Sequence, residues 1–536
     1  MRLPLPVRSL ATLAIVALAT VVLPARAAQP HVLRMADGQD VTTLNPLLAT
    51  SANITTLSEL TMAHFVRFDA HDRPVPELLT EIPSPGNGGI SADGRALTFH
   101  LRHGVRWSDG APFDADDVAY TFAAIANPAN NVSSRDAFDR IVSVAEPDKY
   151  TIVVHLKTPY APFYYKFFST WGLTCLLPKH LLGTSTLFND VPYNALPVGI
   201  GPFRYTSFRR GDAVEMEANP FYFRGRPKLQ KIVYKIITDD NTLLAQVQTG
   251  ELDLWAAVSG TFVDRVRRVP SERVTSVPTA FVSAIYFNTT RPGLTDARVR
   301  RALRLLTDRP YLVNNVYHNA GTIAESVVPA VDADYDRTLP FSRYDPVAAG
   351  RLLDAAGYAR GPGGMRAKAG VPLAIELALP NGYPPSATTA ELLRATWERS
   401  GVAVQTRSYS SNQYFAPASS GGILSLGKFD GALLSLPGGP LADESMDYGC
   451  DAVPPRGFNQ MRYCNPALDA AMNAYVASYD ARKRSHLAKR IQAMIDDDAP
   501  AVVLYQRAFV YAAVSAVSGF VPSTFGPFDN VLGLDR

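Results

Sequence analysis

LTFHLRHGVRWSDGAPFDADDV, residues 97–118, is the most informative stretch of the 536-residue chain. Its first six residues alternate apolar and polar side chains, which predicts a half-buried strand. Residues 107–110 (WSDG) predict a turn. Asp114, Asp116 and Asp117 then predict a helix start, because carboxylates stabilise the free N–H groups of the first turn.

Similar signals on both sides of this stretch predict interleaved strands and helices. Asp239, Asp240 or Asn241 fits the start of a helix and Gly250 its end, and Thr295 or Asp296 fits the start of another. The basic, Gly-rich stretch 360–370 predicts a loop or hairpin tip, and 74–89 a boundary between lobes. We expect a mixed α/β protein with at least two lobes, since 536 residues are too many for one core. Strands are predicted at 32–36, 97–102, 150–156, 231–237, 252–255, 281–288 and 501–505, and further helices at 55–65, 113–125 and, as a pair, within 466–495.

The N-terminus predicts export. Arg2 and Arg8 precede the apolar run Leu10–Leu23, and Ala25-Arg26-Ala27 is a small-x-small cleavage site. These features are typical of a signal peptide, here residues 1–27. The run has 14 residues, fewer than the ~20 that span a bilayer. An uncleaved anchor is the alternative, but we expect a mature periplasmic chain with no membrane insertion.

Charge and cysteine content narrow the class further. Three of the 52 basic residues lie in the leader, which leaves 49 against 49 acidic residues and gives no reason to expect nucleic-acid binding. Cys450 and Cys464 flank a short loop, and in an oxidising compartment we expect a disulfide between them. Cys175 lies among apolar residues and is predicted to be a buried free thiol.

The sequence holds no convincing catalytic, metal or cofactor motif. G-x-S-x-G, H-E-x-x-H, P-loop and C-x-x-C patterns do not occur, and residues 199–201 (GIG) lack the third glycine of a dinucleotide fingerprint. His100 and His103 are expected to be partly exposed rather than metal ligands, and Asp496–Asp498 to be a solvated helix end. We therefore expect no catalysis, no metal and no cofactor. Abundant aromatic residues in an exported, multi-lobed chain suit reversible capture of a polar organic ligand.

Motifs along the chain resemble the extracellular solute-binding proteins of dipeptide, oligopeptide and nickel importers, solute-binding family 5. The strongest is residues 97–118, which resemble the family pattern of a strand, R-x-G-V-x-W/F-x-D-G-x-P and a helix that opens A-x-D-V. The other matching segments cover nearly all of the mature chain: 44–46 (LNP), 199–203 (GIGPF), 219–222 (NPFY) with Gly225 and Pro227, 250–253 (GELD), 287–289 (FNT), 298–303 (RVRRAL) with Asp308 and Arg309, and 463–469 (YCNPALD).

The resemblance implies a two-lobed periplasmic-binding-protein fold of type II with an extra inserted domain, a hinge, and a ligand cleft between the lobes. Lobe I would be discontinuous, comprising 28–72, 197–283 and 507–536. The inserted domain would be 73–196, and lobe II 284–506. The chain would cross the hinge near Phe281–Phe287 and Tyr505–Phe509. The turn at Trp107, Asp109 and Gly110 is expected to be structural.

The resemblance also implies a function. Lobe closure would capture a peptide, and a monomeric carrier would deliver it to an ABC permease in the inner membrane. Its position in the chain makes each of nine residues a predicted ligand contact, and for Trp255 and Phe281 core packing is the alternative. The nine are Asn53, Trp255, Phe281, Ser283, Tyr414, Leu436, Gly438, Asp443 and Tyr505.

One departure from the family leaves the guest open. Peptide-binding relatives commonly carry a Trp-x-x-Asp-type stretch whose Asp pairs with the ligand's α-ammonium. The corresponding segment here, 430–443 (DGALLSLPGGPLAD), has no Trp and no acid between its ends. Either Asp443 or Glu444 takes that role, or the guest has no free α-amino group. Alternatives are therefore a modified peptide, an opine, a sugar derivative or a metal chelate, a secreted enzyme on the same fold, or a chaperone-like or sensor role.

Overall fold

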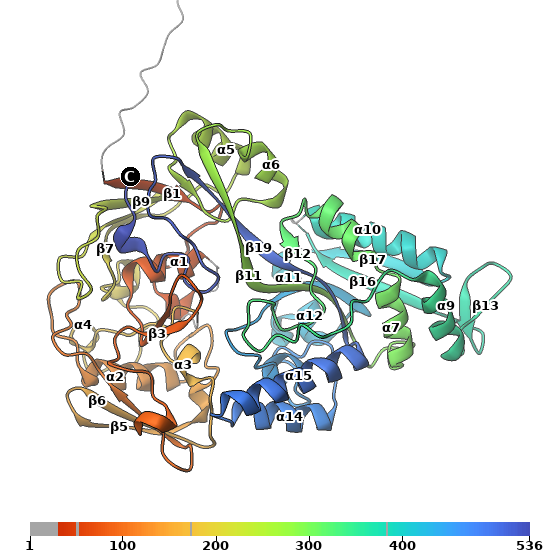
Figure 1. The fold of residues 1–536 in the computed structure, drawn as a ribbon, viewed down its shortest axis with the longest axis horizontal. Helices are drawn as coiled ribbons and strands as arrows, with labels where there is room; N and C mark the ends of the chain where they lie inside the picture. The colour runs from red at the N-terminus through yellow and green to blue at the C-terminus, as the bar shows by residue number, and fades with distance from the viewer. Residues whose placement is uncertain (1–30, 50–52, 172–173, 382–383) are drawn as a thin grey trace, which may run out of the picture.

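The computed structural model describes residues 31–49, 53–171, 174–381 and 384–536, so the predicted signal peptide lies outside the described residues. Two lobes are joined by two long antiparallel strands, β11 (Glu272–Phe287) and β19 (Ala501–Val514) (Figure 1). The predicted strands at 281–288 and 501–505 are only parts of these elements. β11 begins earlier and β19 continues further because each strand serves both lobes.

One sheet of 11 strands runs through both lobes, in the order β17-β16-β18-β11-β19-β10-β1-β9-β8-β7, with β12 also paired to β19. Within it, β1 is parallel to β9 and β10, and β16 is parallel to β17 and β18. Parallel neighbours need crossovers, which is why strands and helices alternate in the sequence. The remaining strands are β1 (Val32–Ala36), β7 (Phe203–Arg209), β8 (Ala213–Ala218), β9 (Lys231–Lys235), β10 (Leu254–Trp255), β12 (Gly321–Thr322), β16 (Ala374–Pro380), β17 (Ala403–Tyr409) and β18 (Gly431–Pro437).

The pairing of β11 with β19 is interrupted midway. Its register shifts between Pro278 and Val282, which is a local irregularity of the bulge type. Side chains fill the break: the Thr279 hydroxyl donates to the Arg507 carbonyl at 3.0 Å, and the Gln506 amide donates to the Thr279 carbonyl at 2.5 Å. Bulges bend and twist strands. The bend therefore lies next to the places where the chain was expected to cross between lobes.

Local signals predicted the helix starts well. Asp114 caps α2 (Ala115–Ala126), Asp239 caps α5 (Asp240–Thr249), and Asp296 caps α7 (Ala297–Leu305). Gly250 ends α5 in the left-handed conformation, with φ of 71°. No helix in the described ranges is long and apolar enough to cross a membrane. Other helices include α1 (Asn53–Thr61), α3 (Phe163–Lys166), α9 (Pro346–Ala355), α10 (Pro384–Arg399), α13 (Ser445–Tyr448), α14 (Pro466–Val476) and α15 (Ala481–Asp498).

The motif at residues 97–118 forms the first strand of a small antiparallel sheet and the turn that follows it. Trp107 is buried, and its indole donates to Asp117 at 3.0 Å. Gly110 closes the turn with φ of 94°, a conformation that favours glycine. The motif is therefore structural, as expected. This sheet has the order β4 (Ala96–His100), β6 (Thr151–Leu156), β5 (Ile141–Asp148); the other small pairings are β2 (Val66–Phe68) with β3 (Pro74–Pro76), and β13 (Ala359–Arg360), β14 (Arg366–Lys368) and β15 (Val371–Pro372).

The cysteine predictions agree with the structure. Cys450 and Cys464 form a disulfide. Cys175 is a free, fully buried thiol, and burial raises its pKa to about 12.

The sequence also predicted the environment of His103 and of the acidic run 496–498. His103 is exposed and stacks on Tyr150, with ring centroids 3.9 Å apart. The prediction of a solvated acid run at 496–498 is wrong for two of its members. Asp496 pairs with Arg304, and Asp498 accepts a hydrogen bond from the Asn465 amide at 2.9 Å.

Candidate functional site

Two segments that are far apart in the sequence meet between the lobes. The Tyr160 hydroxyl donates to Asp443 at 3.3 Å, and the Trp171 indole donates to the Gly438 carbonyl at 3.1 Å. A Cβ on Gly439 would lie 3.1 Å from the Tyr165 ring, so the two segments approach closely at this glycine. The segment 160–171, which includes α3, thus packs against the loop after β18, and Figure 1 shows α3 on one lobe facing the other.

Charged side chains from both segments form one group, which we call the inter-lobe cluster. Lys166 pairs with Asp136 on one side, with side chains 25% and 21% exposed. On the other side, the Ser445 hydroxyl donates to Asp443 at 2.6 Å. The cluster consists of Asp136, Lys166, Asp443, Glu444 and Asp447.

Two carboxylates of this cluster have no partner in the described part of the chain. The Glu444 side chain is 8% exposed and forms neither a hydrogen bond nor an ion pair there, and the half-buried Asp447 forms none either. Burial raises the pKa of Glu444 well above its usual range, and the neighbouring Asp447 and Asp443 raise it further. Burial also raises the pKa of Asp447 to about 7, against the opposing effect of Lys166. A buried carboxylate without a partner is costly when ionised, so it either keeps its proton or is stabilised by a cation.

Five predicted contacts lie along the strands and loop that lead to this cluster. Pairing of β11 with β18 sets Phe281 opposite Pro437 and Ser283 opposite Ser435, whose hydroxyls are 3.0 Å apart. The Phe281 ring lies against Trp171 and Phe509, with centroids 6.3 and 6.2 Å away. The five are Phe281, Ser283, Leu436, Gly438 and Asp443.

The structure places the other four predicted residues inside the lobes. Tyr414 is fully buried, and its hydroxyl already donates to the Ala378 and Leu433 carbonyls at 3.1 and 2.9 Å. Trp255 is also fully buried and packs near Phe262, which favours the core-packing alternative. Contact of Tyr414 and Trp255 with a ligand stays a prediction.

Asn53 and Tyr505 are likewise buried by their own lobes. The Asn53 amide donates to the Asp40 carbonyl at 3.0 Å. The Tyr505 ring lies 4.0 Å from that of Tyr317, centroid to centroid. Both are 2% exposed. Their contact with a ligand stays a prediction.

The sequence predictions missed the surface of the 160–171 segment that contacts the loop after β18. Tyr160, Tyr165, Lys166 and Trp171 were not selected, nor was Asp447 on the opposite loop. A signal was present, since seven of the 12 residues from 160 to 171 are aromatic. Such density next to a single lysine is typical of a contact surface rather than of one strand or helix.

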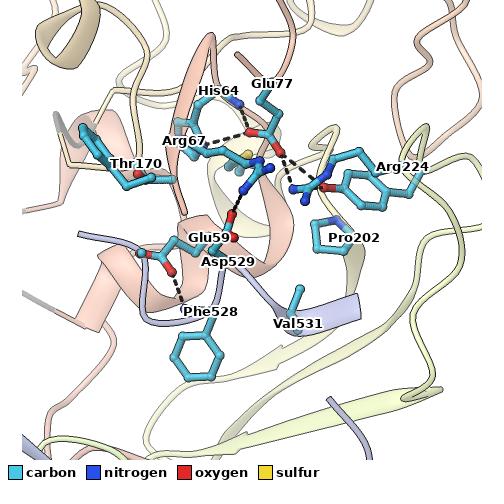
Figure 2. A pocket seen from close by; sticks show the side chains of 14 residues that line it. Glu59, His64, Arg67, Glu77, Thr170, Pro202, Arg224, Phe528, Asp529 and Val531 are labelled. Carbon is cyan, nitrogen blue, oxygen red and sulfur yellow. Dashed lines mark hydrogen bonds and ion pairs between the residues drawn. The ribbon is translucent and has the colours of Figure 1, made fainter. Parts of the chain in front are cut away.

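A second polar group encloses a small cavity of about 20 Å³, which is room for one water molecule (Figure 2). We call it the lobe I network: Glu59, His64, Arg67, Glu77, Arg224 and Asp529, with Tyr222. Each of its carboxylates has a donor. Glu77 accepts a hydrogen bond from the His64 backbone at 2.8 Å and lies 3.5 Å from Arg224. Asp529 pairs with Arg67. Glu59 accepts a hydrogen bond from the Phe528 backbone at 2.8 Å. This network ties α1, β2 and the C-terminal segment together.

A third candidate is an open hollow of about 330 Å³ on lobe II beside β16 and β17. Its acids are already paired, Glu376 with Arg407 at 2.9 Å and Asp430 with Arg291 at 3.5 Å. Within the described residues, no group of three or more His, Cys, Asp or Glu side chains is arranged to hold a metal ion. The inter-lobe cluster is therefore the site with the clearest unmet demand for a partner.

Comparison with known proteins identifies the family of the chain. The family model of bacterial extracellular solute-binding proteins, family 5 (middle), matches residues 43–442. This chain belongs to that family. The predicted family and the two-lobed α/β fold are thus confirmed, and the solute-binding protein carries its unpartnered acids just beyond the matched region.

Individual relatives agree. This solute-binding protein is 25% identical to the dipeptide-binding protein of Escherichia coli over 473 residues, 82% of this chain and 84% of that one. The structure of NikZ from Campylobacter jejuni in complex with Ni(L-His) matches with a TM-score of 0.79 and 23% identity, over 95% of this chain and all of that one. The oligopeptide-binding protein AppA from Bacillus subtilis, in complex with a nonapeptide, matches with a TM-score of 0.76 and 22% identity, over 94% and 98% of the two chains.

Proposed function

We propose that this chain is the periplasmic capture component of an ABC importer, and that it binds a peptide between its lobes and hands it unchanged to a membrane permease. The observation that carries this is the meeting of the 160–171 segment with the loop after β18. A guest that touches both faces favours the closed state, because only differential contact shifts a conformational equilibrium. Relatives named for dipeptide and oligopeptide binding support the peptide class.

Within this proposal, Glu444 is the partner of the peptide's α-ammonium. The sequence left Asp443 and Glu444 as alternatives. Asp443 already accepts hydrogen bonds from Tyr160 and Ser445, whereas the Glu444 carboxylate has no partner among the described residues. A buried charge is stabilised most by the ion that it lacks. A free α-amino group on the guest would meet that demand.

The proposed division of the chain is the one expected from the family: lobe I from 28–72, 197–283 and 507–536, the inserted domain from 73–196, and lobe II from 284–506. Long-range contacts support the return of the C-terminus to lobe I. Arg536 and Arg34 both pair with the buried Asp253, at 2.6 and 2.7 Å. Cleavage of residues 1–27 and a monomeric state belong to the same proposal.

A thermal-shift screen tests the function. Mature protein is melted with di-, tri- and pentapeptides and with their Nα-acetylated forms, and the bound guest is recovered for mass spectrometry. We expect free-amine peptides at 100 times their Kd to stabilise the native state by about 2.7 kcal/mol, acetylated ones to do less, and the guest to return unchanged. No stabilisation by any peptide, or a guest converted into product, would overturn the proposal.

A further inference from the structure

We propose that the preferred guest is a peptide whose first residue is lysine or arginine, so that the inter-lobe cluster holds two positive charges at once, the α-ammonium and the basic side chain. This inference rests on the proposed function and adds the class of peptide. It starts from the charge balance of the cluster.

The cations around the cluster are too few for its acids. Asp136, Asp443, Glu444 and Asp447 supply four carboxylates. Against them stand Lys166 and, 4.4 Å above the Tyr160 ring, Arg140. With all four acids ionised, these groups of the described chain carry an excess of two negative charges, and because burial raises the pKa of Glu444 and Asp447, a bound cation competes with protons for these two acids. One α-ammonium would neutralise half of it.

The two unpartnered acids are spaced for two cations. Glu444 and Asp447 are three residues apart, at the start of and within α13. Helical side chains at this spacing lie on the same face with Cβ atoms about 5 to 6 Å apart. The α-ammonium and side-chain cation of one basic residue can reach both carboxylates together, whereas two separate residues of an extended peptide point to opposite sides.

The surroundings favour a cation and disfavour further acid. Tyr286 and Tyr448, both almost fully buried, feel the charges of Glu444 and Asp447, and aromatic faces attract cations. Asp332 also borders Glu444. It is 3% exposed, and one of its oxygens has no hydrogen-bond partner among the described residues. Burial raises its pKa to about 8, so a cation bound nearby would favour its ionised form.

Isothermal titration of the mature protein, freed of co-purified ligand, tests this with four probes: Lys-Ala-Ala, Ala-Ala-Lys, Ala-Ala-Ala and cadaverine. We expect Lys-Ala-Ala to bind about tenfold more tightly than the other two peptides. Ala-Ala-Lys has the same net charge as Lys-Ala-Ala, so it separates placement of the charge from general attraction. Cadaverine separates a peptide guest from any compact dication.

Near-isosteric variants assign the effect to the cluster. E444Q and D447N should each reduce the preference for Lys-Ala-Ala over Ala-Ala-Ala at least threefold, and the double variant should abolish it. D497N, at an exposed aspartate, should preserve it. Thermal melts confirm that each variant is folded.

The outcomes distinguish the two proposals. Equal affinities for Lys-Ala-Ala and Ala-Ala-Ala, or a preference that survives in the double variant, would overturn this inference and leave peptide capture intact. Binding of cadaverine without binding of any peptide would overturn the peptide class itself. No binding by Ala-Ala-Ala or either lysine peptide would overturn the proposed function.

Discussion

The lobe I network and the inter-lobe cluster are built from the same residue types, but they differ in balance. In the lobe I network, Arg67 pairs with Asp529 and Arg224 lies beside Glu77. The Phe528 backbone N–H donates to Glu59, whose pKa burial raises well above its usual range. Burial also lowers the pKa of His64 to about 3, so it is neutral. Each carboxylate of this network therefore has a donor from the same network or from the backbone.

The inter-lobe cluster lacks this balance. Glu444 and Asp447 have no partner among the described residues, although one is nearly buried and the other half-buried. A closed ionic network connects segments of one lobe and stabilises the fold. An open one, at the junction of two lobes, leaves charge that a guest can neutralise. Four predictions test this difference, from the largest expected effect to the smallest.

Breaking the lobe I network should destabilise the protein most. R67M leaves Asp529 and Glu77 short of a buried cation, and loss of one partner of a buried pair should lower the free energy of unfolding by about 4 kcal/mol. Chemical denaturation measures this. R73M removes an exposed arginine that pairs with Asp69, and should change little. A loss below about 1 kcal/mol for R67M would refute the structural role.

Removing the disulfide tests how much the cross-link next to Glu444 and Asp447 contributes to the free energy of unfolding. Cys450 and Cys464 are bonded and lie just after α13. In the chain-entropy model, C450S should lower the free energy of unfolding by about 3 kcal/mol. C464S and the double variant should give the same loss in urea denaturation. A much larger loss for the single variants than for the double variant would show that the remaining free thiol, not the lost cross-link, determines the effect.

Asp447 should affect the pH dependence of stability in a way that an exposed acid does not. Its native pKa of about 7 exceeds its unfolded value, so the native state holds the proton more tightly. Its ionisation therefore lowers the free energy of unfolding as pH rises from about 4 to 7.

D447N removes that loss. The stability of D447N relative to wild type should grow by about 2 kcal/mol across this range, measured by denaturation at several pH values. D497N should show no such trend. A difference between D447N and wild type that is constant with pH would contradict the assignment.

The smallest expected effect has the opposite sign to that of R67M. E444Q replaces a nearly buried carboxylate that has no partner among the described residues, so the ligand-free protein should become more stable by about 1 kcal/mol. The melting temperature of protein stripped of ligand measures this. A loss of stability would mean that Glu444 belongs to the fold in the way that the lobe I network does.

Local sequence determined the elements. Asp114, Asp239 and Asp296 cap the helices that they predict, because a side-chain cap depends only on neighbouring backbone N–H groups. The same holds for Gly250 and for the turn at Trp107. The disulfide was also predictable, since compartment and spacing favour it. The family motifs fixed the overall architecture for the same reason: they encode turns and caps.

Tertiary structure alone brought the site together. Lys166 and Asp447 lie far apart in the chain, and only the packing of the two lobes places them in one cluster. Packing also buries Tyr414 and Trp255, which the sequence could not show because burial within a lobe depends on elements distant in sequence. Whether a charge has a partner is likewise a property of the assembled fold, which is why Asp443 and Glu444 were alternatives in the sequence and differ in the structure.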